Sequence, residues 1–221
     1  MADMRRNSPE PPPGMPRIEH KPGMANEMLQ ELGPLLAEEG IDVDDIEVDD
    51  MDTLQRAFDR AVERRNLELF TPIGPAREVA VTTLRQIVEA ILAGDSVRAG
   101  RVLDYPQPEA PDDSVPTVAA CTGTALGLLD EHLGGHTADA PAGLAGQATL
   151  PPGHWTGKRA ATDILALAGK GRAFRSLDAL TARQGGAHVL AGSVLALAAV
   201  TQAWAQRTNT PHADLIQTTI R

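Results

Sequence analysis

The chain has 221 residues, of which 42% are hydrophobic and only 3% aromatic, and its formal net charge is −10. This composition excludes a collagen-like fibre, a disulfide-rich scaffold and a wholly disordered chain, and the negative charge argues against a protein that coats nucleic acid through bulk charge. A single cysteine cannot form an internal disulfide, and the sequence shows neither a secretory signal nor an apolar stretch of the roughly 18–20 residues that a membrane helix needs. We therefore expect a cytoplasmic protein without a membrane partner, folded as one mid-sized domain or two small ones.

The first part of the chain, residues 1–24, contains six prolines among polar residues. Proline fixes φ and lacks an amide donor, so this composition predicts an extended, disordered tail. Residues 25–70 follow as an acidic helical segment. This segment combines a helix expected at residues 26–39, interrupted at Pro34, with an amphipathic helix expected at residues 53–70.

Between these two helices, residues 38–52 contain nine acidic side chains and no lysine or arginine, and aliphatic residues alternate with the carboxylates. An EF-hand calcium loop does not fit, because the sixth position counted from Asp42 is Glu47, where such a loop needs glycine. Two interpretations stay open. The segment is a docking strip for a basic partner, or it is a solvated acidic connector that folds against the basic C-terminal third of the chain.

The remaining residues, 71–221, show helical periodicity interrupted by glycine and proline. No convincing strand pattern is found, so we predict an all-α fold, a helical bundle of about six to eight helices. The expected helices span residues 75–94, 96–104, 114–133, 158–168, 172–183, 187–206 and 211–220. A Gly/Ala/Pro-rich connection at residues 134–157 separates the first three of these helices from the others, and it is either a lid or a linker.

Two parts of this bundle are similar in sequence. RAGRVLD at residues 98–104 and RAFRSLD at residues 172–178 share Arg, Ala, Arg, Leu and Asp at the same spacing, and the apolar helices downstream of both stretches also align. The similarity predicts an internal repeat, with copies at residues 78–133 and 158–206. Two related three-helix units would then pack about a pseudo-twofold axis.

The stretch LALAGKGRAF at residues 165–174 joins two predicted helices through Gly-Lys-Gly. It resembles the hairpin of helix-hairpin-helix modules, whose backbone amides hold a nucleic-acid phosphate. Five basic residues would supply charge to such a site: Lys158, Arg159, Lys170, Arg172 and Arg175. The alternative interpretation is a glycine cap between two helices. An NTP-binding phosphate loop does not fit nearby, because Gly153 and Gly157 enclose three residues where that motif has four.

Other groups with reactive side chains form no clear constellation. His132 and His136 have the i, i+4 spacing of a metal site that His154 could complete, but two glycines lie between them, and we interpret them as surface histidines at a helix end. Cys121 lies in an apolar helical run and is interpreted as a small buried hydrophobe. No arrangement brings a nucleophile, a base and an orienting group together, so we predict no catalytic residue, no metal, no cofactor and no enzymatic activity.

These observations predict a non-enzymatic protein that acts in protein–protein interaction, as a scaffold or regulator. The predicted partner-binding surface joins the acidic segment to an exposed helical face: Asp42, Asp44, Asp45, Glu47, Asp49, Asp50, Arg56 and Arg60. The expected partner is another protein, a second copy of this chain in a homodimer being one form of it. The alternative is a nucleic-acid-associated protein that contacts phosphates through the Gly-Lys-Gly hairpin and the basic C-terminal third. A third possibility is a small-molecule or metal site between the bundle and the loop at residues 134–157.

Overall fold

The structure, a computed structural model, describes residues 67–109, 112–134, 140–141 and 143–221, together with the separate positions 33, 34, 37, 56, 59, 60 and 64. The chain divides into two compact units, Met1–Arg65 and Asn66–Arg221. Every described position of the first unit is helical. The predicted tail at residues 1–24 and the acidic stretch at residues 38–52 lie outside the described residues.

The second unit confirms the all-α prediction, since its described residues form a helical bundle in which an isolated bridge between Gln107 and Thr117 is the only β-type pairing. After a helical stretch at residues 67–70, the α-helices are α3 (Gly74–Leu92), α4 (Ser96–Leu103), α5 (Val118–Leu133), α6 (Lys158–Ala168), α7 (Leu177–Gln184), α8 (Gly186–Thr208) and α9 (His212–Thr219). Two short 3₁₀ helices, η3 (Leu144–Gly146) and η4 (Phe174–Ser176), precede α6 and α7.

Local sequence signals place several helix ends where they were predicted. Pro75 lies in the first turn of α3, where the missing amide hydrogen of proline is not needed. Asp95 caps α4, because its side chain accepts a hydrogen bond from the Arg98 amide at 2.9 Å. α6 has the bounds predicted for it, and α8 extends its predicted helix by a few residues at its C-terminal end.

Two predicted helix starts are wrong. α5 begins at Val118 instead of residue 114, because Pro116 disfavours helical geometry in the residue before it and Thr117 then caps the helix through the Ala120 amide at 3.0 Å. α7 begins at Leu177 instead of residue 172, because the chain first passes through a turn and η4.

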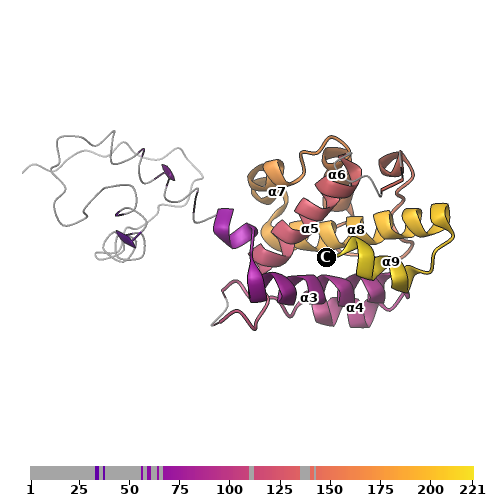
Figure 1. Ribbon diagram of the computed structural model, residues 1–221, viewed down its shortest axis with the longest axis horizontal. Helices are drawn as coiled ribbons and strands as arrows, with labels where there is room; N and C mark the ends of the chain where they lie inside the picture. Colours follow the sequence, from indigo (N-terminus) through magenta and orange to yellow (C-terminus); the bar gives the residue numbers. More distant parts are fainter. Residues whose placement is uncertain are drawn as a thin grey trace, which may run out of the picture. The chain divides into compact units, whose positions relative to one another are not determined.

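Three layers of helices make up the described part of the second unit (Figure 1). α5 and α8 lie in the middle, α3 and α4 cover one side, and α6 and α7 cover the other. α8 is the core helix, with every residue from 189 to 201 buried. By length and composition α8 could cross a membrane, but 78% of its most apolar window is buried inside the domain, as is usual for a core helix.

Glycines allow the backbones of this unit to approach closely at two places. A Cβ atom added to Gly192 of α8 would lie 2.5 Å from the Cβ of Ala160 in α6, and one added to Gly123 of α5 would lie 1.8 Å from the carbonyl oxygen of Phe70. Neither distance is sterically allowed, so both positions require glycine. The core is therefore closely packed although it contains few aromatic residues.

The C-terminal helix α9 is held by side chains of α3 and α5. Arg85 of α3 donates hydrogen bonds to the carbonyl oxygens of Ile220 at 2.8 Å and Gln217 at 3.3 Å. His132 Nε2 of α5 lies 2.6 Å from the carbonyl oxygen of Thr219. These donors satisfy carbonyl groups that the last turn of a helix leaves without intrahelical partners.

The two sequences aligned as a repeat differ in local structure. Residues 98–104 lie almost entirely in α4, whereas residues 172–178 run through a turn, η4 and the start of α7. The internal repeat therefore stays a prediction. The described part of the predicted connection at residues 134–157 contains η3, whose Leu144 is buried in the core.

Candidate functional site

The predicted partner-binding surface lies mostly in the first unit. Of its eight residues, Arg56 and Arg60 are described, and both are exposed on helical backbone one turn apart. The six acidic residues of the set, Asp42, Asp44, Asp45, Glu47, Asp49 and Asp50, lie outside the described residues. This surface stays a prediction.

The structure separates the predicted phosphate-binding residues into two groups. Lys158 and Arg159 begin α6, whereas Lys170, Arg172 and Arg175 follow the other end of the same helix, and all five side chains are exposed. α6 has 11 residues, so a rise of about 1.5 Å per residue places its ends about 16 Å apart. The five basic residues thus do not form one cluster around a single phosphate.

The backbone amides of the Gly-Lys-Gly turn are all bonded inside the molecule. Those of residues 169–172 donate to carbonyl oxygens of α6: Gly169 to Leu165 at 3.0 Å, Lys170 to Leu167 at 2.9 Å, Gly171 to Ala168 at 2.9 Å and Arg172 to Leu167 at 3.1 Å. This pattern is that of a glycine-assisted helix end, with Gly171 at a φ of +62°.

The next two amides of the turn bind a carboxylate from another helix. Asp130 of α5 accepts hydrogen bonds from the amides of Ala173 at 2.8 Å and Phe174 at 2.9 Å, one on each carboxylate oxygen. The carboxylate therefore lies where an external anion would bind to the start of the helical segment η4–α7. Asp130 therefore has a structural role. A phosphate at this turn could be contacted by the side chains of Lys170, Arg172 and Arg175, since the backbone amides are already bonded.

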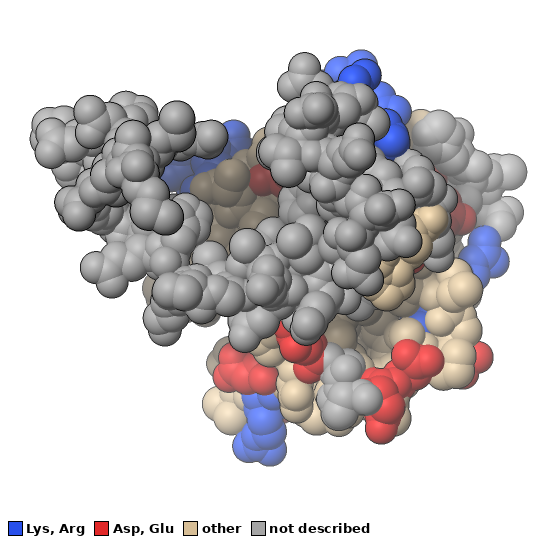
Figure 2. Space-filling model, turned by 90° about the vertical axis from the view of Figure 1, so that its left-hand side faces the viewer, with Lys and Arg blue, Asp and Glu red and all other residues tan. Residues whose placement is uncertain are grey.

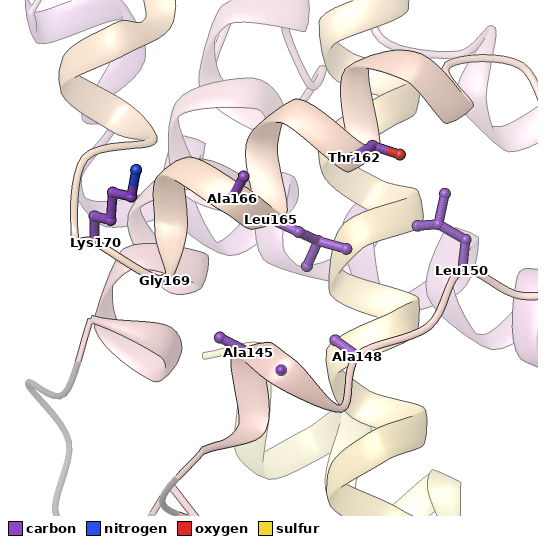
Figure 3. A pocket seen from close by; sticks show the side chains of 9 residues that line it. Ala145, Ala148, Leu150, Thr162, Leu165, Ala166, Gly169 and Lys170 are labelled. Atoms are coloured by element: carbon purple, nitrogen blue, oxygen red, sulfur yellow. The ribbon is translucent and has the colours of Figure 1, made fainter.

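An open apolar groove lies beside α6. It has a volume of about 480 Å³ and runs between α6 and the segment that contains η3. Figure 3 shows Ala145 and Ala148 facing α6 across the groove, Leu165 of α6 between them, Lys170 at one end and Leu150 at the other. Among its lining residues Lys170 is the one that carries a charge.

Charge is distributed unevenly over the second unit. Residues 71–152 contain 4 basic and 10 acidic residues, and residues 153–221 contain 8 basic and 3 acidic residues. In Figure 2 acidic side chains gather in the lower part of the viewed face, at the level where α3 and α4 lie in Figure 1. The groove beside α6 is formed by residues 145–150 of the acidic stretch and by residues 162–170 of the basic stretch, and Lys170 supplies its charge.

The loop after α4 contributes exposed acidic residues, among them Asp104, Glu109, Asp112 and Asp113. The Asp112 carboxylate accepts hydrogen bonds from the side chain and the amide of Ser114. These bonds stabilise the charged form and hold the pKa of Asp112 below its ordinary value. The described residues of this loop thus add negative charge to the domain surface.

Two candidate reactive side chains are buried in α5. Cys121 is fully buried, which confirms its interpretation as a small buried hydrophobe, and this burial raises the pKa of its thiol to about 12. The interpretation of His132 as a surface histidine is wrong, because the side chain is 5% exposed and packs edge-on against Trp204 with 5.5 Å between ring centroids. Its Nε2 binds Thr219, and its Nδ1 has no hydrogen-bond partner.

Sequence reasoning did not identify the residues that line the groove or the role of Asp130. The sequence signal that could have indicated packing of this segment is a series of apolar residues at short intervals in a Gly/Ala/Pro-rich stretch: Leu144, Ala148 and Leu150. Comparisons of the chain with protein-family models, with curated proteins and with solved structures find no match. The roles given to these residues are therefore assigned from their contacts.

Proposed function

We propose that this protein is a non-enzymatic protein-binding protein whose helical domain binds an acidic, amphipathic segment of a partner in the groove beside α6. The observation that carries this proposal is the combination of an apolar groove of about 480 Å³ with a single charged lining residue, Lys170, at one end. Such grooves bind the apolar face of an amphipathic segment, and a charge at the end selects its direction and register.

The chemistry of the lining defines the partner segment. Leu150 and Leu165 offer aliphatic surface, and the alanines around them leave room for aliphatic side chains of the partner. Lys170 favours a carboxylate at the corresponding end, and the nearby Arg172 adds to the positive potential there. The partner segment therefore presents aliphatic side chains to the groove and carries a carboxylate at the end that meets Lys170.

Three side chains of the described residues with reactive or ionisable groups are held by contacts within the fold. Asp130 binds two amides of the η4 turn, Asp163 accepts hydrogen bonds from Arg183 at 3.0 Å and Gln184 at 2.7 Å, and Cys121 is buried as a thiol. In the described part of the chain, no group of three His, Cys, Asp or Glu side chains could hold a metal ion.

The test uses a fluorescein-labelled peptide with the sequence of residues 38–53, because this sequence has the chemistry required of the partner segment. Its anisotropy is measured on titration with the full chain. Ala166→Glu, which places bulk and negative charge in the groove, and Lys170→Glu are each expected to weaken binding by about tenfold or more. The titration is repeated with a full chain that carries Asn at positions 44, 45, 49 and 50. These substitutions remove competition between the chain's own acidic segment and the labelled peptide.

Two matched variants control for charge and for folding. Ala182→Glu makes the same substitution on an exposed alanine of α7, and Arg159→Glu reverses a charge at the far end of α6; both are expected to bind within about twofold of the wild type. Equal losses in all four variants, or no binding of the peptide, would contradict the proposal. Salt-sensitive binding of a DNA duplex that is weakened by Arg159→Glu and Lys170→Glu alike would instead favour the nucleic-acid alternative.

Self-association is measured separately, because a second copy of the chain is one source of an acidic amphipathic segment. Sedimentation equilibrium gives the oligomeric state of the wild type and of the Ala166→Glu variant. A dimer that dissociates in the Ala166→Glu variant identifies the partner as another copy, and a monomer in both directs the search to a different protein.

A further inference from the structure

A second, more enclosed cavity of about 100 Å³ lies on the opposite side of α8 from α6, among α3, α4, α8 and the loop before α6. Its walls are aliphatic, formed by Ile87 and Ile91 of α3, Leu103 of α4, and Val194 and Leu195 of α8. Ile87, Val194 and Leu195 are at most 1% exposed, so the inner part of the cavity is shielded from solvent. This cavity shares no residue with the groove beside α6.

Polar groups gather on the outer side of the cavity. Ser96 comes from the first turn of α4, and His154 and Thr156 come from the loop before α6; all three residues are exposed. They can donate and accept hydrogen bonds, and the lining contains no Lys, Arg, Asp or Glu. A molecule that fits this cavity is therefore apolar at its inner end and makes a hydrogen bond at its outer end.

The loop that covers the cavity has a defined conformation. Trp155, which lines the cavity, donates a hydrogen bond from Nε1 to the carbonyl oxygen of Pro152 at 2.9 Å. Gly157 ends the loop at a φ of +80°, where an added Cβ would lie 2.6 Å from the Gly192 amide nitrogen of α8. The loop is thus ordered by a local hydrogen bond and packs closely against α8 at Gly157, as expected of a largely preformed small-molecule site.

Gly100 forms the part of the cavity wall that α4 contributes between Ala99 and Leu103. It lies inside α4 and lines the cavity, and a Cβ atom added to it would meet no atom within 4 Å. Glycine destabilises a helix interior relative to alanine, and here no close packing requires it. At Gly123, Gly157 and Gly192, in contrast, an added Cβ would clash.

We propose that this cavity is a binding site for a small, uncharged organic molecule with an aliphatic or aromatic body and one hydroxyl-type group. The size follows from the volume, because an apolar cavity of about 150 Å³ binds benzene and one of 100 Å³ with an open outer end takes a body of similar or slightly smaller size. The inner end of the ligand contacts Ile87, Val194 and Leu195, and its hydroxyl group reaches Ser96, His154 or Thr156. This site is separate from the protein-binding groove, so either proposal can fail without the other.

The probe for this proposal is phenol, titrated into the full chain labelled with ¹⁵N and followed by amide chemical shifts. Saturable shifts are expected for residues 96–103, 154–157 and 191–195. Gly100→Leu fills the cavity and is expected to weaken phenol binding by about tenfold or more.

Gly127→Leu is the matched control, because Gly127 is also a half-buried helical glycine whose added Cβ would meet no atom within 4 Å, but it does not line the cavity. It is expected to bind phenol within about twofold of the wild type. Gly100→Ala, a smaller change that suits the helix, guards against misfolding of the leucine variant and is expected to give an intermediate loss. Shifts that do not saturate, that spread over the whole domain, or that persist unchanged in both Gly100 variants would overturn the proposal.

Discussion

α8 packs in two different ways on its two sides. Against α6 it comes so close that Gly192 has no room for a Cβ atom, with Ala160 and Ala161 in direct contact. Against α4 it leaves a cavity beside Gly100, where an added Cβ would touch nothing. Glycine thus allows two helices to approach closely on one side and leaves space unfilled on the other. The two situations can be distinguished only by the atoms that surround each glycine.

The largest effect is expected on the tight side, from Gly192→Ala. The added methyl group would lie 2.5 Å from the Ala160 Cβ and 2.8 Å from the Ala161 nitrogen, so α6 and α8 must move apart. The free energy of unfolding is expected to fall by about 3 kcal/mol. Urea unfolding followed by circular dichroism measures the change. Gly127→Ala is the control, and an unchanged stability of Gly192→Ala would show that the two sides do not differ as described.

A somewhat smaller loss is expected from Asp130→Ala, which removes the bonds that fix the turn after α6 to α5. Two amides, those of Ala173 and Phe174, lose a charged acceptor. The free energy of unfolding is expected to fall by about 2 kcal/mol. Asp113→Ala, an exposed loop carboxylate, is expected to have little effect in the same urea titration. If both variants behaved alike, Asp130 would not hold this turn.

On the loose side, Gly100→Ala is expected to stabilise the protein. Alanine is a better residue for a helix interior, and its methyl group has space beside the cavity. The free energy of unfolding is expected to rise by about 0.5–1 kcal/mol. The same titration measures it, and a destabilised variant would mean that α4 and α8 are as tightly packed as α6 and α8.

Near neutral pH, the smallest effect on stability is expected from ionisation of the buried Cys121 thiol. Cys121 belongs to α5, in the middle layer. Its pKa is raised from 9.0 to about 12 by burial, so the folded state favours the protonated thiol. Its contribution to stability is therefore complete below pH 9 and is lost as the pH rises from 9 towards 12. At pH 8, alkylation by iodoacetamide is expected to be about 1,000-fold slower than in urea-unfolded protein, because the thiolate fraction falls by about that factor. Mass spectrometry measures the rate, and rapid labelling of the folded chain would show that the layer opens locally.

Much of this fold could be predicted from the sequence, because helix ends depend on nearby residues. Pro75, Asp95 and the glycines around α6 act within a few positions of themselves. The candidate sites depend on distant pairs instead. Asp130 binds amides 43 and 44 residues away, and the groove forms only when the η3 segment lies beside α6. No periodicity encodes such pairs, so a site between the bundle and the loop at residues 134–157 could be named as a possibility, but the residues that line the groove and the cavity could not be predicted.

The contact between α9 and α3 affects the order in which the domain folds during synthesis. α9 has 8 residues, which is too short to be a stable helix alone, and its carbonyl groups depend on Arg85 of α3 and His132 of α5. The partners of this contact are separated by 132 to 135 residues in the case of Arg85. During synthesis α3 leaves the ribosome long before α9, so the contact between these two helices is among the last of the domain to form.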